Sequence, residues 1–514
     1  MTTAAGTAMI KVVHDTYADS LLLLVATSDM SECEGVSWAG AVMATPAGRE
    51  SLAAEGFDAD ELGDLGSNDL VLAVRAEDQA AAERAFDAGA KAISSEAPEA
   101  VGGAPAPRSI ASAASRLSAA NVAIISVPGS YAALEAHHAL TAGLHVLLFS
   151  DNVPKEEEVE LKKRGNELGL LVMGPGAGTA VLAGTGLGFA NDVRRGPVGV
   201  VAAAGTGAQE VSALLDRWGI GVSHVIGVGG RDLSADIGGR MAIAAVRALD
   251  ADPDTKAILL VSKPPNEAVA REVLAQCGDT PAVATFLGLD DLDTPEGVHM
   301  ARTLEDGALA AARLVGHAAE VSADDLPAAV ATAIDGLSAE RRTVRGYYSG
   351  GTLCYEAQLI IGDLLGGVHS NEPLVEANTV PAPPGAHVLL DLGAEEYTDG
   401  RPHPMIDPSL RIDTIRANAR DADVAAVLLD VVIGYGAHED PAGQLAPVCQ
   451  EVMADGGPQV IAYVLGSATD PQGYDAQVQK LRDVGCIVTD TAARAAFAAA
   501  AIAARKPAWV EQPA

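Results

Sequence analysis

The chain has 514 residues, of which 49% are hydrophobic and only 4% aromatic, and its formal net charge is −35. This length predicts roughly three or four domains with aliphatic cores, and the negative charge argues against a protein that binds the backbone of nucleic acids. Five scattered cysteines without a Cys-x-x-Cys pair argue against disulfides and a zinc ribbon, so no metal site is expected. Neither a leader-like segment nor a long uncharged apolar run occurs. We therefore expect a cytoplasmic protein without membrane contact.

The first 95 residues predict a small α+β domain. Three segments are expected to be strands: residues 12–14, 37–44 and 70–74. Helices are expected near residues 17–26, 47–55 and 77–90. This alternation fits a βαββαβ-like sandwich. Residues 97–115, rich in Pro, Ala, Ser and Gly, are expected to form a linker.

Residues 116–192 predict half of a nucleotide-binding, Rossmann-like fold, although the fingerprint Gly-x-Gly-x-x-Gly does not occur there. Buried strands are expected at residues 121–127, 144–150 and 170–173. Ligands of open α/β sheets bind at the carboxyl ends of such strands. The candidate cofactor-binding residues lie in the loops after the first two strands: Pro128, Gly129, Ser130 and Asn152. The pattern requires no cofactor, but it leaves room for a nucleotide.

Residues 193–335 and 340–514 are expected to be two copies of one flavodoxin-like domain. In each copy an apolar strand ends in Gly-Thr-x-x-x-Glu, where a helix is expected to start. Later segments match in order as well, such as residues 254–260 with residues 423–429. The expected fold class is therefore α/β: a Rossmann-like domain and two duplicated flavodoxin-like domains, with a small α+β domain at the N-terminus.

The two Gly-Thr turns are the strongest functional feature of the sequence. Glycine lets a ligand approach the backbone, and the free N–H groups at a helix start attract an anion. A capping box of Thr206 and Gln209 explains the first turn without a ligand, but the second turn has Tyr355 at the Gln209 position. The repetition favours two helix ends aimed at one phosphate. The candidate phosphate-binding residues are Gly205, Thr206, Gly207, Gly350, Gly351 and Thr352.

Three further residues are candidates for charge balance or proton transfer, and we expect them to have catalytic roles. Lys263 follows the expected strand 258–262, and Arg345 stands four residues before Ser349, so either could balance the charge of a phosphate. His438 follows the expected strand 426–433 and could act as a general acid or base. Ordinary solvated side chains would explain Lys263 and His438 equally well.

Several of these segments resemble the FdrA family, which is related to the succinyl-CoA synthetase alpha subunit and to NDP-forming acyl-CoA synthetases. The matching segments lie at residues 143–154, 172–179, 188–191, 204–210, 345–354, 434–438 and 470–472. The resemblance implies a CoA-binding-type domain at residues 116–192 and succinyl-CoA-synthetase-like duplicated domains. The synthetases carry a phosphorylated histidine in Gly-His-Ala-Gly-Ala, whereas here the strand 258–262 leads into Lys263-Pro264-Pro265 and no such segment follows.

The resemblance also implies a function. FdrA-family proteins of allantoin and purine catabolism are implied to act in oxamate carbamoyltransferase, which converts oxalurate and phosphate to oxamate and carbamoyl phosphate with companion subunits. The paired turns would hold the phosphate, and the loop with Gly434, Tyr435 and Gly436 would shape the substrate site. Two alternatives stay open: an acyl-CoA synthetase component that binds CoA, and a non-catalytic scaffold for partner enzymes. An oligomer is expected.

Overall fold

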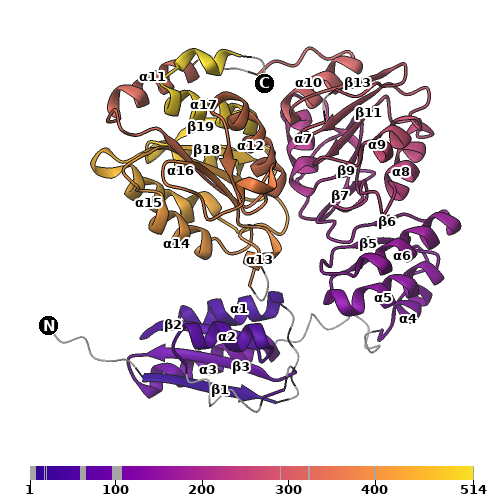
Figure 1. The fold of residues 1–514 in the computed structure, drawn as a ribbon. Helices are drawn as coiled ribbons and strands as arrows, with labels where there is room; N and C mark the ends of the chain where they lie inside the picture. Colours follow the sequence, from indigo (N-terminus) through magenta and orange to yellow (C-terminus); the bar gives the residue numbers. More distant parts are fainter. Residues whose placement is uncertain are drawn as a thin grey trace. The chain divides into compact units, whose positions relative to one another are not determined.

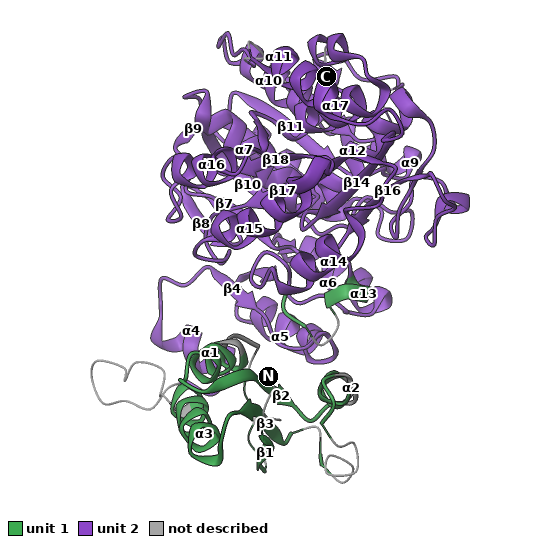
Figure 2. Cartoon of the chain, turned by 90° about the vertical axis from the view of Figure 1, so that its left-hand side faces the viewer, with its two compact units in different colours: residues 1–106, 395–402 green, residues 107–394, 403–514 purple. Residues whose placement is uncertain are grey.

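The computed structural model describes residues 7–14, 16, 18, 20–57, 65–66, 68–94, 107–289, 291–321, 325–398 and 401–512. The chain divides into two compact units, residues 1–106 with 395–402 and residues 107–394 with 403–514 (Figures 1 and 2). Most of the expected linker lies outside the described residues, and its last part is helix α4 (Ile110–Arg116). Within the described ranges, no helix combines the length and the apolar character needed to cross a membrane.

The smaller unit is an α+β domain with a three-stranded antiparallel sheet, in the order β1-β3-β2. Its elements are β1 (Thr7–Val13), α1 (Ser20–Ser31), β2 (Val36–Met43), α2 (Pro46–Ala54), β3 (Leu70–Ala76) and α3 (Gln79–Ser94), with the short α13 (Glu395–Thr398). The expected α+β class is confirmed. The expected βαββαβ order is wrong for the described part of this unit, because α2 separates β2 from β3 and no fourth strand is found there.

The larger unit begins with three parallel strands in the order β4-β5-β6. The elements are β4 (Val122–Ile125), α5 (Gly129–Thr141), β5 (His145–Leu148), α6 (Lys155–Leu168) and β6 (Val172–Met173). This is the expected Rossmann-like half-fold. At the carboxyl edge of this sheet, Gly129 allows a close approach of two backbone segments, because a Cβ on Gly129 would lie 2.3 Å from the Asp151 carbonyl oxygen. The loops after β4 and β5 therefore pack directly on each other.

The first flavodoxin-like copy is built on a seven-stranded sheet in the order β13-β12-β11-β9-β10-β7-β8. Its elements are β7 (Thr179–Leu182), β8 (Thr185–Gly188), β9 (Arg195–Ala203), α7 (Gly205–Arg217), β10 (Val222–Gly227), α8 (Arg240–Asp250), β11 (Ala257–Ser262), α9 (Glu267–Leu274), β12 (Ala282–Phe286), β13 (Val298–Met300) and α10 (Leu304–Leu314). The hairpin β7–β8 was not expected from the sequence; its strand β7 pairs in antiparallel fashion with both β10 and the edge strand β8.

The second copy has a six-stranded parallel sheet in the order β15-β16-β14-β17-β18-β19. Its elements are α11 (Leu326–Gly336), β14 (Thr343–Tyr348), α12 (Gly351–Leu365), β15 (Val368–His369), β16 (His387–Asp391), α14 (Ser409–Asn418), β17 (Val424–Val432), α15 (Pro441–Met453), β18 (Gln459–Leu465), α16 (Tyr474–Asp483), β19 (Ile487–Thr489) and α17 (Ala492–Ala504). The shared strand order confirms the duplication: β9 to β13 correspond to β14 and β16 to β19. The expected domain boundaries stay predictions.

Four helices join the two copies. Helices α7 and α10 of the first copy pack against α12 and α17 of the second, with α7 beside α12 (Figure 1). Helix α17 is almost entirely alanine and buried, and such small side chains allow close packing of helices. Glu305 of α10 adds a polar link to α17, since it accepts a hydrogen bond from the Thr491 hydroxyl at 2.6 Å and pairs with Arg494 at 2.6 Å.

The glutamates of the repeated Gly-Thr-x-x-x-Glu motif link the copies reciprocally. Glu356 of α12 accepts a hydrogen bond at 2.6 Å from the N–H of Leu304, the first residue of α10. Glu210 of α7 accepts one at 3.4 Å from the N–H of Ala492, the first residue of α17. Each carboxylate thus caps a helix of the other copy. Burial raises the pKa of Glu210 to about 7 and that of Glu356 to about 8.

We expect Glu356→Gln to change how stability depends on pH. With a folded pKa of about 8 and an unfolded pKa of about 4.3, Glu356 contributes stability that is complete below the unfolded pKa. That contribution is lost as the pH rises toward the folded pKa, because only the unfolded chain releases the proton. Glutamine does not ionise. The variant should therefore become more stable relative to wild type between about pH 5 and about pH 8. The difference in unfolding free energy should change by about 1–3 kcal/mol, and the difference in Tm should change accordingly.

Thermal unfolding followed by circular dichroism measures this difference. Glu267→Gln is the matched control, because Glu267 lies in an exposed pair with Arg271. Its Tm difference from wild type should be the same at both pH values. If the Tm difference from wild type changed with pH equally in both variants, the pH dependence could not be assigned to the ionisation of Glu356.

Candidate functional site

The structure brings the two Gly-Thr turns into direct contact. Helix α7 begins at Gly205 and helix α12 at Gly351, and the Thr352 N–H donates to the Thr206 hydroxyl oxygen at 3.3 Å. A Cβ on Gly207 would lie 3.0 Å from the Thr352 methyl group, and one on Gly350 would lie 2.8 Å from the Thr206 methyl group. Glycine at these two positions therefore lets the helix starts meet.

The first turn has N–H groups available for a ligand. Its N-cap residue is Ala204, without a side-chain cap, so the expected capping box of Thr206 and Gln209 is wrong. The N–H groups of Gly205, Thr206 and Gly207 meet no acceptor among the described residues. Gly205 is exposed, and a Cβ there would have no neighbour within 4 Å. An anion can therefore approach the positive end of α7.

The second turn already holds a carboxylate. Asp430, at the carboxyl end of β17, accepts hydrogen bonds from the N–H groups of Ser349 at 2.8 Å and Gly350 at 2.7 Å. It also accepts the Ser349 hydroxyl at 3.1 Å and pairs with the buried Arg411 at 2.8 Å. Gly350 was expected to bind phosphate, and this expectation is wrong for its N–H group. The two copies are thus chemically unequal where their helices meet.

Lys263 connects the first copy to the second turn. It directly follows β11, whose last residue Ser262 pairs with Ala203 at the end of β9. Its Nζ lies 3.2 Å from where a Cβ on Gly351 would stand, and an Asp391 carboxylate oxygen lies 2.3 Å from the same point. Burial raises the pKa of Asp391 to about 6, while Lys263 opposes this shift. Lys263 therefore lies beside the second turn, and its expected role as a charge partner for phosphate stays a prediction.

His403 also lies at this site, although it was not expected there from the sequence. Its Nδ1 accepts a hydrogen bond from the Met405 N–H at 3.2 Å, so the ring proton lies on Nε2. Nε2 is 2.7 Å from where a Cβ on Gly393 would stand, and the Ser349 carbonyl oxygen is 2.6 Å from that point. Burial lowers the pKa of His403 to about 4, which leaves a neutral N–H donor near the second turn.

Arg345 does not reach the paired turns. Its guanidinium donates to the Ala386 carbonyl at 2.7 Å and lies 3.8 Å from the Asp421 carboxylate. These partners precede β16 and β17, so the guanidinium occupies the amino edge of the sheet. The turns lie at the carboxyl edge. The expected charge-balancing role of Arg345 is therefore wrong.

His438 is held by hydrogen bonds to its own loop and to Met405. Its N–H donates to the Met405 carbonyl at 2.8 Å, and its Nδ1 accepts the Asp440 N–H at 2.9 Å. These bonds place His438 next to the segment that carries His403, but none of them joins it to a Gly-Thr turn. Of these two histidines, His403 is the one at the site.

The loop with Gly434, Tyr435 and Gly436 packs against the segment after β8. The Tyr435 N–H donates to the Ala190 carbonyl at 2.9 Å, and a Cβ on Gly436 would lie 2.9 Å from the Phe189 ring. Phe189 also contacts the rings of Phe149 at 5.4 Å and His403 at 6.1 Å between centroids. This row of rings links the Rossmann-like domain to the paired turns.

The expected cofactor-binding residues share the carboxyl edge of the Rossmann-like sheet. Pro128, Ser130 and Asn152 are exposed, and Gly129 is buried against the loop after β5. Phe149 belongs to that same loop, immediately after β5. A ligand held by this edge would therefore lie at the start of the row of rings that ends at His403.

Comparison with known proteins supports this architecture. A CoA-ligase family model matches residues 347–502, and a model described as AllF, heavy metal-associated domain, matches residues 6–107. The chain is 38% identical to the uncharacterized protein YahF of Escherichia coli over 502 residues, which cover 93% of this chain and 95% of YahF. It is 30% identical to ADP-forming succinate–CoA ligase subunit alpha 2 of Archaeoglobus fulgidus over 177 residues, 33% of this chain and 60% of that one.

Among solved structures, a dinucleotide-forming acetyl-coenzyme A synthetase of Ca. Korarchaeum cryptofilum aligns with 76% of this chain and 84% of its own. The sequence identity is 16% and the TM-score 0.32. As for the heavy-metal description, the described part of the chain contains no group of three or more His, Cys, Asp or Glu side chains that could hold a metal ion.

We expect Asp430→Asn to destabilise the second copy strongly. The substitution removes the charge that pairs with Arg411, and breaking a buried ion pair costs about 3–5 kcal/mol. Chemical denaturation measures the loss. The double variant Asp430→Asn/Arg411→Met should cost less than the sum of the single variants, because the unpaired charge is also removed. Asp413→Asn, in an exposed pair with Arg416, is the control and should cost less than about 0.5 kcal/mol. Additive effects at Asp430 and Arg411 would contradict this pairing.

Proposed function

We propose that this chain, which belongs to the FdrA family, is an enzyme subunit that binds the phosphate of an acyl phosphate on a fold of the CoA-ligase type. The first Gly-Thr turn carries this proposal, because Gly205, Thr206 and Gly207 present N–H groups without acceptors among the described residues. Lys263 supplies a cation from the neighbouring strand. Fixed N–H groups and a cation can stabilise phosphate charge without rearrangement during the reaction.

His403 completes the proposed site with a neutral donor. A neutral imidazole N–H can polarise an acyl oxygen by hydrogen bonding without adding a formal charge. The Met405 N–H holds the tautomer in which Nε2 carries the proton. We assign Nε2 of His403 to the acyl oxygen and Lys263 to the phosphate. This division of roles needs no phosphorylated histidine.

The first candidate reaction is acyl-CoA synthesis. The match to the CoA-ligase model and the likeness to succinate–CoA ligase alpha subunits support it. In this reaction the CoA sulfur bonds to the acyl carbon, and the bond from that carbon to the phosphate oxygen breaks. CoA would lie on Pro128, Gly129, Ser130 and Asn152, at the start of the row of rings Phe149, Phe189 and His403. Companion subunits would supply the nucleotide site.

The second candidate is carbamoyl transfer, which the match of residues 6–107 to the AllF-described model favours. Starting from oxalurate, a phosphate oxygen bonds to the carbamoyl carbon, and the bond from that carbon to the oxamate nitrogen breaks. The nitrogen takes up the proton that phosphate gives up. Both candidates thus make or break a bond between an acyl carbon and a phosphate oxygen, which is the chemistry proposed for the turns.

Lys263→Met should weaken the binding of inorganic phosphate about ten- to a hundredfold, because a hydrogen bond to a charged group is worth about 1.5–3 kcal/mol. Isothermal titration calorimetry measures the affinity. Lys256→Met is the control, because the Lys256 ammonium is exposed and bonds to its own turn at Pro253. Equal affinities in wild type and Lys263→Met, with both proteins folded, would rule out Lys263 as the phosphate cation.

Turnover separates the two reactions. The chain, purified with its companion subunits, would be given oxalurate and phosphate in one assay and a carboxylic acid, ATP and CoA in the other. Carbamoyl phosphate or a thioester is the respective product. In the productive assay, His403→Gln should lower kcat about a hundredfold or more, as loss of an oxyanion donor does. His299→Gln, at an exposed strand position, should not. No product in either assay would refute the enzymatic proposal.

A further inference from the structure

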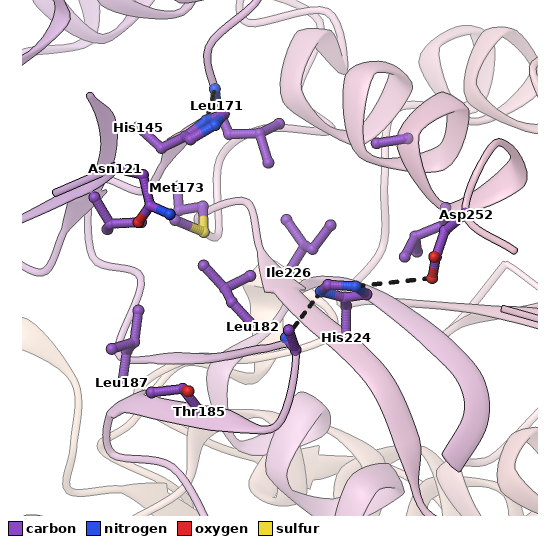
Figure 3. A pocket seen from close by; sticks show the side chains of 14 residues that line it. Asn121, His145, Leu171, Met173, Leu182, Thr185, Leu187, His224, Ile226 and Asp252 are labelled. Carbon is purple, nitrogen blue, oxygen red and sulfur yellow. Dashed lines mark hydrogen bonds and ion pairs between the residues drawn. The ribbon is translucent and has the colours of Figure 1, made fainter. Parts of the chain in front are cut away.

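A separate pocket lies at the amino edge of the Rossmann-like sheet (Figure 3). No residue of the paired turns is among the described residues that line it. Its volume is about 660 Å³, which is in the usual range for small-molecule sites. Its walls come from the ends of β4 to β6, the hairpin β7–β8, β10 and the end of α8. None of the roles proposed above uses this pocket.

One wall is a partly covered face of the β4-β5-β6 sheet. Residues paired in a parallel sheet point to the same face, so Val122 and His145 share a face, and Met173 shares it through its partner Leu147. Ile124, on this same face, is 55% exposed. The sheet therefore presents apolar side chains that its own domain does not fully cover.

The opposite wall is also apolar but ends in a polar pair. Leu182 and Leu187 of the hairpin stand beside Ile226 of β10. His224 of β10 accepts the Ala183 N–H on Nδ1 at 3.2 Å, and its Nε2 lies 3.7 Å from the Asp252 carboxylate (Figure 3). Asp252 thus gives this end of the pocket a hydrogen-bond acceptor with a negative charge.

His145 marks the other end of the pocket. Its Nδ1 accepts the Leu171 N–H at 2.9 Å, so the ring proton lies on Nε2. The side-chain amide of Asn121 lies close by (Figure 3). This end therefore offers N–H donors, whereas the Asp252 end offers an acceptor.

The charge of the lining selects the kind of ligand. None of the described residues that line the pocket is Lys or Arg, and Asp252 is the lining carboxylate. An anion would lose its hydration without gaining a cation and would meet the charge of Asp252. Phosphate and CoA are therefore poor ligands for this pocket, in contrast to the first Gly-Thr turn.

We propose that this pocket is a second ligand site, which binds an uncharged small molecule with a mainly apolar body. The ligand places a hydrogen-bond donor toward Asp252 and an acceptor toward His145 and Asn121. The leucines of the hairpin and Ile226 cover its apolar body. The site does not depend on the acyl-phosphate chemistry proposed above.

Two fluorescent probes test the charge selectivity. N-phenyl-1-naphthylamine is neutral, apolar and carries one N–H donor, and 8-anilino-1-naphthalenesulfonate has the same ring system with an added sulfonate. We expect saturable binding of the neutral probe at one site per chain, about tenfold or more tighter than the sulfonate. Asp252→Lys should reduce the ratio of the affinities for the neutral probe and the sulfonate. Asp254→Lys, at a nearby exposed position, should leave this ratio unchanged.

Pocket-filling variants test the location. Leu187→Trp should weaken binding of the neutral probe about tenfold or more at an unchanged Tm. If this variant unfolds, Thr185→Trp, at the first residue of β8, takes its place. Leu134→Trp, at a position that is 59% exposed and outside the pocket, should not. The proposal is overturned by unsaturable binding, by equal affinity for the two probes, or by unchanged affinity for the neutral probe in a pocket-filling variant that stays folded.

Discussion

The reciprocal capping of helices by Glu210 and Glu356 is the interaction on which the candidate site depends. Each glutamate stands four residues after the Thr of its turn and bonds to the start of a helix in the other copy. The two copies are thereby held so that Thr206 meets Thr352. Burying two carboxylates is costly, and their raised pKa values record that cost. The repeated Glu thus stabilises the junction between the copies, and the Gly-Thr before it lies at the candidate site.

Duplication produced two similar turns with different chemistry. The first turn keeps its N–H groups open, whereas Asp430 fills the second and is itself neutralised by Arg411. Lys263 of the first copy then reaches across to Gly351 of the second. A site built at the junction of two copies can combine an open helix end, a cation and a neutral donor, which no single copy contains. This asymmetry is the reason to assign one phosphate, and not two, to the paired turns.

Local patterns in the sequence predicted most of the fold. Long apolar runs located the strands of both copies, and the repeated motif revealed the duplication, because these features depend on neighbouring residues. Contacts between distant segments could not be predicted from the sequence. These contacts are the partners of Glu210 and Glu356, the partners that hold Arg345 at the opposite edge of the sheet, and the hydrogen bonds of Asp430 to the second turn. His403 lies in an irregular Pro-rich segment without periodicity. The hairpin β7–β8 has strands of only four residues, too short for a clear alternation.

Localising a phosphate analogue in crystals would show whether phosphate binds at the paired turns. Tungstate has the tetrahedral shape of phosphate, and its anomalous scattering in crystals marks its position. We predict one strong peak within hydrogen-bond distance of the Gly205, Thr206 and Gly207 N–H groups, beside Lys263. A peak at the Ser349 and Gly350 N–H groups with Asp430 displaced, or tungstate bound only elsewhere on the molecule, would contradict it.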